Sequence, residues 1–484
     1  MSGVTDLSSI IKAYDVRGVV PQELSPTVAR AIGEAFAREV VAPEGASRVV
    51  VGHDMRESGP GLVEAFAQGV TSQGVDVVRI GLCSTDGLYF ASGSLDAPGA
   101  MFTASHNPAR YNGIKLCRVG ARPVGQDSGL AQVRTRAEEL LDGTAGAAGP
   151  DGAETTPGVI GDVDLLAEYA AFLRGLVDVS TVRPLKVVVD AGNGMAGLTV
   201  PAVLGSAAGL PALPLEIVPL YFELDGTFPN HEANPLEPAN LVDLQAAVVA
   251  HEADIGLAFD GDADRCFVVD ERGGAVSPSA VTALVGMREI TRELAAGRTP
   301  TIIHNLITSR AVPDLLGAAD ARLVRTRVGH SFIKAEMASH DAVFGGEHSA
   351  HYYFRDFWFA DTGMLAALHV LAALGSQDHP LSALAEMYTP YSASGEINST
   401  VSDAAEAAER VREVYTRAYP EAVVDTLDGM TVSHWDGQHP RWWFNLRASN
   451  TEPLLRLNVE AADEDIMIKL RDDVLSLVRE EKDA

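Results

Sequence analysis

Short apolar runs rich in valine and isoleucine recur along the chain, and each gives way to a longer stretch with a helical pattern. The clearest runs lie at 48–54, 185–194 and 301–305, and each ends in a polar turn. β-Branched runs of this length predict strands, and apolar residues that return every three or four positions predict helices. Strands that alternate with helices predict βα units and a largely parallel sheet.

A second apolar run follows each of these runs after about 40 to 70 residues, and it ends in an unusual polar loop. The loops lie at 103–108, 260–265 and 346–351. This repetition predicts three copies of one α/β domain. Because open α/β sheets bind ligands at the carboxyl ends of their strands, the three loops can share one cleft.

The pattern changes from about Ser394 onward. A strand-like start precedes a helix over 403–418, strands around 442–444 and over 454–459, and a terminal helix. This order predicts an α+β domain and not a fourth copy. The terminal helix has one apolar stripe, formed by Ile466, Met467, Leu470, Val474, Leu477 and Val478.

Domain boundaries are marked by stretches that break the helical and strand patterns. The segment 143–158 is rich in glycine, alanine and proline, and 375–380 interrupts a helical pattern. A length of 484 residues favours three or four domains at roughly 100 to 200 residues each. We expect α/β domains at 1–157, 158–274 and 275–388, with mixed and largely parallel sheets, and the α+β domain at 389–484.

Composition limits the classes of partner. The formal net charge is −29, from 37 Lys+Arg and 66 Asp+Glu, which argues against nucleic acid or an anionic membrane as a partner. No signal segment is visible, and the apolar run 364–374 is about half the roughly 20 residues that span a bilayer. Three widely spaced cysteines match neither a zinc site nor a disulfide framework. We expect a cytoplasmic monomer or homodimer.

The loop at 260–265 places three carboxylates at alternate positions, Asp260, Asp262 and Asp264. Hard oxygen ligands of this kind suit Mg²⁺ or Ca²⁺. A calcium EF-hand would need glycine at the sixth position, where Arg265 stands, and helices at both flanks, where the pattern predicts strands. A solvated acidic turn is the other alternative. An arginine beside three metal ligands indicates that an anion binds next to the metal.

The loop at 103–108 presents Ser105 between Ala104 and His106, with the turn formers Asn107 and Pro108 after it. A serine hydrolase would instead show Gly-x-Ser-x-Gly. A structural turn is the alternative, but beside a metal loop Ser105 becomes a candidate for a phosphoserine.

Three further groups are candidates for substrate contact. Lys115, shortly after the Ser105 loop, is either an exposed solubilising lysine or a general base, and a base would need a lowered pKa. Glu347 and Ser349 suit two vicinal sugar hydroxyls, although a helix N-terminus would have a similar sequence. The segment 447–451 combines a guanidinium with hydroxyl and amide donors, which suits a phosphate, with a capped turn as the alternative.

These residues together resemble the α-D-phosphohexomutases, in particular the bacterial phosphomannomutase/phosphoglucomutase group. The resemblance extends over nearly the whole chain in several motifs that follow one another in the family's order. The motifs lie at 14–18, 51–59, 103–108, 225–231, 260–265, 328–331, 346–351 and 447–451.

The resemblance implies four domains around a central cleft and a reaction through a hexose 1,6-bisphosphate, which also serves as activator. It implies that Ser105 carries the phosphoryl group and that one Mg²⁺ is held by the three aspartates and a phosphate oxygen. The implied roles place Arg265, Arg17 and His330 near the transferred group, Lys115 as general base, and Glu347 and Ser349 on the sugar hydroxyls. The distal phosphate would be bound by Arg447, Ser449, Asn450 and Thr451.

Two positions depart from the family pattern. Ala350 stands where the family commonly has glycine, and in the segment 305–310 Arg310 is the basic side chain where some relatives have a substrate-contacting lysine. The leading hypothesis is interconversion of mannose 6-phosphate and mannose 1-phosphate, with activity on glucose phosphates. The alternatives are a phosphoglucomutase and, from another class, a non-catalytic module that binds a phosphosugar or calcium.

Overall fold

The computed structural model describes residues 5–12, 14–144, 156–437, 439–448 and 454–480. The chain forms two compact bodies. The first comprises 1–276, 337–344 and 349–382, and the second comprises 277–336, 345–348 and 383–484. Most of the predicted linker 143–158 lies outside the described residues.

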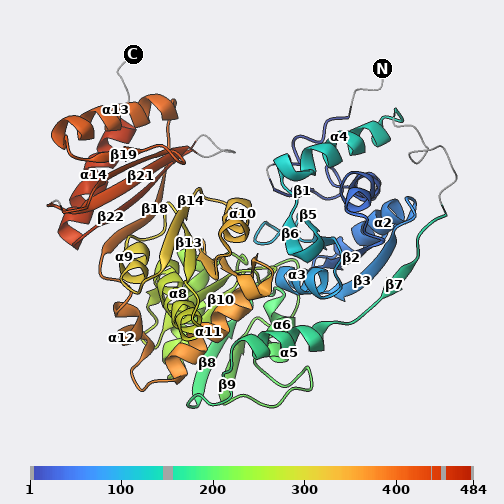
Figure 1. Ribbon diagram of the computed structural model, residues 1–484, viewed down its shortest axis with the longest axis horizontal. Coiled ribbons are helices and arrows are strands. Elements are labelled where there is room, and N and C mark those ends of the chain that lie inside the picture. The colour runs from blue at the N-terminus through green and yellow to red at the C-terminus, as the bar shows by residue number, and fades with distance from the viewer. Residues whose placement is uncertain (1–4, 13, 145–155, 438, 449–453, 481–484) are drawn as a thin grey trace. The chain divides into compact units, whose positions relative to one another are not determined.

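The first body opens with a sheet of strand order β1-β5-β4-β2-β3-β7, with β6 beside β5. Its central strand β2 lies parallel to β3 and β4, and β4 continues into the antiparallel β5. Helices α1, α2 and α4 pack together over this core (Figure 1). The strands are β1 Val16–Val19, β2 Arg48–His53, β3 Asp76–Leu82, β4 Gly99–Phe102, β5 Tyr111–Arg118, β6 Arg122–Pro123 and β7 Ile160–Asp162, and the helices are α1 Pro26–Phe36, α2 Gly59–Thr71, α3 Thr85–Ser94 and α4 Leu130–Leu141.

A second sheet in the same body repeats this arrangement. Its order is β12-β11-β10-β8-β9, so that β8 lies parallel to β9 and β10, and β10 continues into the antiparallel β11. The predicted repetition of the α/β unit is therefore confirmed for these two copies. The strands are β8 Leu185–Asp190, β9 Leu215–Leu220, β10 Ile255–Phe259, β11 Cys266–Asp270 and β12 Ala275–Val276, and the helices are α5 Leu166–Leu176, α6 Ala196–Val203 and α7 Val242–Ala250.

The third copy is divided between the two bodies. In the second body β13 and β14 pair in parallel, as β8 and β9 do, and in the first body β16 and β17 pair antiparallel. The strands are β13 Thr301–Asn305, β14 Arg322–Thr326, β15 Phe344–Gly346, β16 Tyr352–Phe354 and β17 Ala360–Asp361. The helices are α8 Pro278–Ala295, α9 Ala311–Gly317, α10 His330–His340, α11 Gly363–Gly375 and α12 Leu381–Glu386.

The C-terminal part of the second body is the predicted α+β unit. An antiparallel sheet of order β18-β22-β21-β20-β19 is covered on one face by α13 and α14 (Figure 1). Each helix begins at an aspartate, Asp403 or Asp463, whose side chain accepts from backbone N–H groups of the first turn. The elements are β18 Ser392–Thr400, α13 Ala404–Ala418, β19 Val423–Asp425, β20 Met430–His434, β21 Trp442–Ala448, β22 Leu454–Ala461 and α14 Glu464–Arg479.

The predicted fold class is confirmed: α/β units with mixed sheets precede an α+β unit. The apolar stripe of α14 packs into the core, with Met467, Leu470, Val474 and Val478 buried. Within the described part of the chain, no helix combines the length and the apolar character needed to cross a membrane.

Candidate active site

Two of the predicted loops lie together in the first body, because each follows a central strand of its sheet. The Ser105 loop follows β4, and the aspartate loop joins β10 to β11. Lys115 lies on β5, which returns antiparallel beside β4 with Lys115 opposite Met101. The EF-hand alternative is excluded, because strands and not helices flank the aspartate loop.

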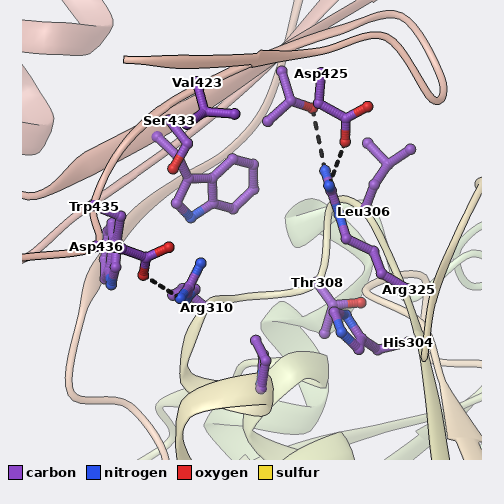
Figure 2. Close-up of a pocket in the computed structure, with 13 residues that line it drawn as sticks. His304, Leu306, Thr308, Arg310, Arg325, Val423, Asp425, Ser433, Trp435 and Asp436 are labelled. Atoms are coloured by element: carbon purple, nitrogen blue, oxygen red, sulfur yellow. Dashed lines mark hydrogen bonds and ion pairs between the residues drawn. The ribbon is translucent and has the colours of Figure 1, made fainter. Parts of the chain in front are cut away.

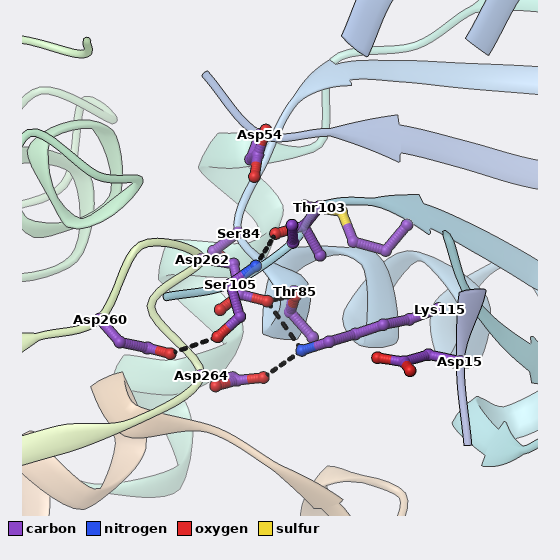
Figure 3. Close-up of polar contacts among 12 residues, drawn as sticks. Asp15, Asp54, Ser84, Thr85, Thr103, Ser105, Lys115, Asp260, Asp262 and Asp264 are labelled. Carbon is purple, nitrogen blue, oxygen red and sulfur yellow. Dashed lines mark hydrogen bonds and ion pairs between the residues drawn. The ribbon is translucent and has the colours of Figure 1, made fainter. Parts of the chain in front are cut away.

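Ser105 is buried, with 4% of its surface exposed, and it adopts a left-handed backbone conformation with φ of 48°. Its Oγ donates to Asp260 Oδ2 at 2.8 Å, and its N–H donates to Thr103 Oγ1 at 2.8 Å (Figure 3). Non-glycine residues rarely take this conformation, and when they do the surroundings hold them there. The serine hydroxyl is therefore fixed against a carboxylate of the aspartate loop.

Asp260, Asp262 and Asp264 are buried, and each offers a carboxylate oxygen within 4.8 Å of the others. Lys115 Nζ donates to Asp262 Oδ2 at 2.7 Å and to Asp264 Oδ2 at 2.6 Å (Figure 3). Thr85 Oγ1 also donates to Asp262 Oδ2, at 2.6 Å.

The second oxygens of this cluster test whether it fits a metal ion. Asp262 Oδ1 and Asp264 Oδ1 are buried and have no hydrogen-bond partner. Buried acceptors without a donor are costly, and a hard divalent cation would satisfy both. The donor set therefore fits a hard divalent cation such as Mg²⁺.

The surroundings shift the pKa values of two of these carboxylates in opposite directions. Burial raises the pKa of Asp260 to about 8, against the opposing effect of Arg265. For Asp262 burial acts in the same direction, but the charge and hydrogen bond of Lys115 outweigh it and bring the pKa below its usual value. Burial tends to lower the pKa of Lys115, yet Asp262 and Asp264 raise it above its usual value. Lys115 is therefore an ammonium in this arrangement, which is the opposite of the shift that a general base needs.

Arg265 joins the aspartate loop to the serine loop. Its Nε donates to Asp260 Oδ2 at 3.0 Å and its Nη2 to His106 Nδ1 at 2.8 Å. His106 Nδ1 thus acts as an acceptor, and burial together with Arg265 and Arg17 lowers the pKa of His106 well below its usual value. Arg17 reaches the same loop, since its Nη1 donates to the carbonyl oxygen of Ala104 at 3.1 Å.

Ser349 lies in the first body, and the sequence reasoning missed its neighbour His351. Ser349 Oγ and His351 Nδ1 are 2.9 Å apart, and His351 Nε2 lies 3.7 Å from Asp264 Oδ1. A backbone bridge between Arg265 and His351 holds this segment against the aspartate loop. The signal in the sequence was the position of His351 at the end of the same polar loop, 346–351.

Glu347 and His330 lie in the second body. Glu347 is buried, and its Oε1 accepts from Asn305 Nδ2 at 2.9 Å and from the N–H of Gly329 at 3.2 Å. His330 begins α10 directly after Gly329. Glu347 therefore holds the backbone directly before His330, through the N–H of Gly329.

Arg447 lies near the end of β21, with 16% of its side chain exposed and its Nη2 3.8 Å from Glu396 Oε2. The other members of the predicted phosphate loop, Ser449, Asn450 and Thr451, lie outside the described residues.

Arg310 lines a pocket of about 360 Å³ in the second body, between the β13–β14 segment and strands β19 and β20 (Figure 2). It pairs with Asp436 across the pocket and with Asp314 on α9. Both contacts are internal, so the structure gives Arg310 a role in joining these segments.

The first body thus brings together a serine hydroxyl, a carboxylate cluster that fits a metal, and three cationic side chains, those of Lys115, Arg265 and Arg17. These are the groups that phosphoryl transfer requires. Family models match most of the chain: domains I, II and III of phosphoglucomutase/phosphomannomutase, each described as alpha/beta/alpha, match 8–140, 167–274 and 278–391, and the C-terminal domain matches 396–477.

Among known proteins, the chain is 38% identical over 474 residues to a phosphomannomutase of Escherichia coli, covering 97% of this chain and 98% of that protein. It is 40% identical over 467 residues to a protein of Xanthomonas campestris pv. campestris named phosphohexose mutases, covering 96% and 98%. A crystal structure of a phosphoglucomutase/phosphomannomutase family protein from Burkholderia thailandensis superimposes with a TM-score of 0.82 at 31% identity, covering 98% of each chain. The chain belongs to the phosphoglucomutase/phosphomannomutase family.

Proposed function

We propose that this chain is a phosphomannomutase, an isomerase that interconverts mannose 6-phosphate and mannose 1-phosphate and also acts on glucose phosphates. The observation that carries the proposal is the 2.8 Å contact of Ser105 Oγ with Asp260, inside a carboxylate cluster that fits a metal. Relatives at 38% and 40% identity over nearly the full length support the substrate class.

In the proposed reaction Ser105 carries a phosphoryl group on Oγ. The Oγ–P bond breaks while the free hydroxyl oxygen of a hexose monophosphate forms a bond to phosphorus, giving a hexose 1,6-bisphosphate. After the bisphosphate has turned end over end, its other ester bond breaks and the Oγ–P bond forms again, while the released sugar oxygen takes up a proton. A hexose 1,6-bisphosphate would therefore also activate a chain whose Ser105 has lost its phosphate.

Asp260, Asp262 and Asp264, with a phosphate oxygen on Ser105, would hold one Mg²⁺, which supplies positive charge to the transferring phosphoryl group. Arg265 and Arg17 both reach the Ser105 loop and add to that charge.

The proton of the attacking hydroxyl needs an acceptor, and Lys115 is the candidate. The negative charges of Asp262 and Asp264 raise the pKa of Lys115, so the amine keeps its proton as long as it is the cation that pairs with them. Lys115 can act as a base only when another positive charge, such as a bound metal ion, compensates these two carboxylates in its place.

Substrate recognition is assigned to the remaining predicted residues. Glu347 and Ser349 would bind the sugar hydroxyls, His330 would lie near the transferred group, and Arg447 with 449–451 would bind the distal phosphate. Because the bisphosphate binds in both orientations, the distal site must recognise charge and not the carbon that bears it. We propose four domains at 1–157, 158–274, 275–388 and 389–484, and we place a monomer or homodimer in the cytoplasm.

The deciding experiment is a mutase assay on mannose 1-phosphate and glucose 1-phosphate with Mg²⁺ and a trace of hexose 1,6-bisphosphate. Conversion of both, with preference for mannose, is expected, and a strong preference for glucose would favour a phosphoglucomutase. A folded protein that converts neither sugar would overturn the proposal in favour of a binding module. In intact-mass spectra Ser105→Ala should lose any roughly 80 Da phospho-adduct, and Ser128→Ala, in a surface turn of the same domain, should keep it.

A further inference from the structure

Arg56 is a fully buried arginine, with 2% of its surface exposed, on the segment that leaves β2. Its guanidinium has five N–H donors. The structure gives each donor nitrogen a partner: Nε donates to Asp54 Oδ2 at 3.2 Å, Nη1 to the carbonyl oxygens of Pro108 at 3.0 Å and Tyr111 at 2.9 Å, and Nη2 to those of Ser105 at 2.9 Å and Asn107 at 2.7 Å.

Three of these five acceptors are backbone carbonyls of the Ser105 loop, and a fourth is the carbonyl of Tyr111, where β5 begins. The loop places Ser105 in a left-handed conformation, φ 48°, that a non-glycine residue rarely adopts. Such a conformation persists where the surroundings determine it. Arg56 holds the carbonyl of Ser105 itself and three carbonyls on its C-terminal side, so it determines the course of the backbone from which the hydroxyl projects.

The segment that follows β9 of the second sheet covers Arg56. The ring of Phe228 lies over the guanidinium, 5.2 Å from Cζ to the ring centroid. Gly226 lies against the backbone of Arg56, where a Cβ would come within 2.8 Å of Arg56 Cα. The motifs at 51–59 and 225–231 thus meet around one side chain, and neither has a role in the proposed chemistry itself.

We propose that Arg56 is a positioning residue for phosphoryl transfer, which fixes the Ser105 loop through its planar fork and is held in place by Phe228. This inference rests on the proposed function. Lysine would keep the positive charge beside Asp54 but has one nitrogen and three donors, so it cannot reach four carbonyls arranged around a fork. Misplacement of a reacting group by about 1 Å can cost on the order of 10²-fold in rate.

The experiment follows phosphorylation of Ser105 in Arg56→Lys. The dephosphorylated protein is mixed with glucose 1,6-bisphosphate and Mg²⁺, and the roughly 80 Da adduct is timed by intact mass, alongside kcat and KM. We expect the rate of adduct formation and kcat to fall on the order of 10²-fold, with KM for the sugar phosphate nearly unchanged. Hydrogen exchange should accelerate over 103–111.

The matched control is Arg174→Lys. Arg174, on α5, also donates to three backbone carbonyls, those of Val203, Gly205 and Pro211, none of which belongs to the Ser105 loop. It should lose stability and keep the rate of adduct formation. If Arg56→Lys kept both the rate of adduct formation and the exchange rate of 103–111, the positioning role would be refuted.

A second variant keeps the test open if Arg56→Lys does not fold. Phe228→Leu leaves Arg56 in place and removes the ring above it, so a several-fold fall in the same rate is expected, and an unchanged rate would contradict the inference. Failure of the wild-type protein to form any adduct would count against the proposed function. The exchange measurement would still decide whether Arg56 holds the loop.

Discussion

Two groups of charged contacts, one in each body, are built differently. The first body holds the Ser105 cluster, which consists of Ser105, Lys115, Asp260, Asp262, Asp264 and Arg265. All of its members are buried except Lys115, whose side chain is 15% exposed, and its three carboxylates are at most 1% exposed. In the second body a carboxylate latch (Asp425, Asp428, Asp436 and Glu460) accepts hydrogen bonds from the β13–α10 region. Within the latch Glu460 is 2% exposed, whereas the side chain of Asp436 is 79% exposed.

The two groups differ in how their charges are compensated and in how strongly salt screens them. In the buried cluster each charged side chain is compensated by an oppositely charged neighbour, so removal of one partner leaves an uncompensated buried charge. The exposed pairs of the latch are screened by salt and solvent and contribute little each. The comparison therefore predicts that the Ser105 cluster is rigid and insensitive to salt, and that the exposed pairs of the latch respond to ionic strength.

The largest effect is expected from Lys115→Met. It leaves Asp262 and Asp264 buried without their cation, and breaking a buried pair costs roughly 3–5 kcal/mol. The metal-free protein should therefore unfold at a much lower temperature, and Mg²⁺ should stabilise the variant more than it stabilises the wild type. Thermal unfolding with and without Mg²⁺ measures both.

The control for this variant is Lys186→Met, because Lys186 is 34% exposed and lies 3.7 Å from Glu216. It should change neither the unfolding temperature by more than a degree or two nor its response to Mg²⁺. Equal stabilisation of wild type and Lys115→Met by Mg²⁺ would mean that Lys115 does not compensate the metal-binding carboxylates.

The second prediction concerns pH and Asp86, which follows Thr85 at the start of α3. Its buried carboxylate accepts from Tyr169 and Thr362 hydroxyls, both at 2.7 Å, and burial raises its pKa to about 6. Because the folded pKa lies above the unfolded value, the folded state binds the extra proton. The stability from this group is complete below about pH 4 and is lost as pH rises through about 6, by roughly 3 kcal/mol.

The Asp86→Asn side chain cannot ionise. The free energy of unfolding of this variant should therefore not show the decrease that the wild type shows as pH rises through about 6. Chemical unfolding at pH 4, 5, 6 and 7 measures the difference between variant and wild type. A difference that stays constant over this range would show that folding does not raise the pKa of Asp86.

The third prediction separates two members of the latch. Glu460 accepts from the N–H of Arg310 at 2.8 Å and from Trp443 Nε1 at 2.7 Å, so Glu460→Gln should cost about 1–3 kcal/mol. Because Trp443 lies on β21, the strand that leads to Arg447, KM should rise more than kcat falls.

Asp436→Asn removes an exposed partner of Arg310 and should cost less than about 1 kcal/mol, an effect that disappears at high salt. Chemical unfolding and KM at low and high salt test both variants. If the two variants behaved alike, burial would not be what separates the members of the latch.

Local pattern was enough to predict the strands and the polar loops at their ends, because both depend on neighbours in sequence. The spacing of Asp260, Asp262 and Asp264 likewise identified the cluster that offers a metal site. Thr85 and Arg56 could not be predicted, since each acquires its role by contacts with residues about 50 to 180 positions away. The same reason applies to Lys115, whose pKa is set by two carboxylates from another domain.

The smallest effect is expected at Ala350, in the loop that passes from Glu347 in the second body to Ser349 in the first. Ala350 has a φ of 65° and is fully buried. Glycine would relieve the roughly 1–2 kcal/mol that a left-handed conformation costs an L-residue. It would also lose about 0.8 kcal/mol of methyl burial and about 0.5–1 kcal/mol of backbone entropy. Ala350→Gly should therefore change the free energy of unfolding by less than about 1 kcal/mol, and KM should not move, because the contact of Ser349 with His351 remains. Chemical unfolding and steady-state kinetics measure the two, and a gain above about 2 kcal/mol would mean that this loop stores more strain than the left-handed conformation of one residue accounts for.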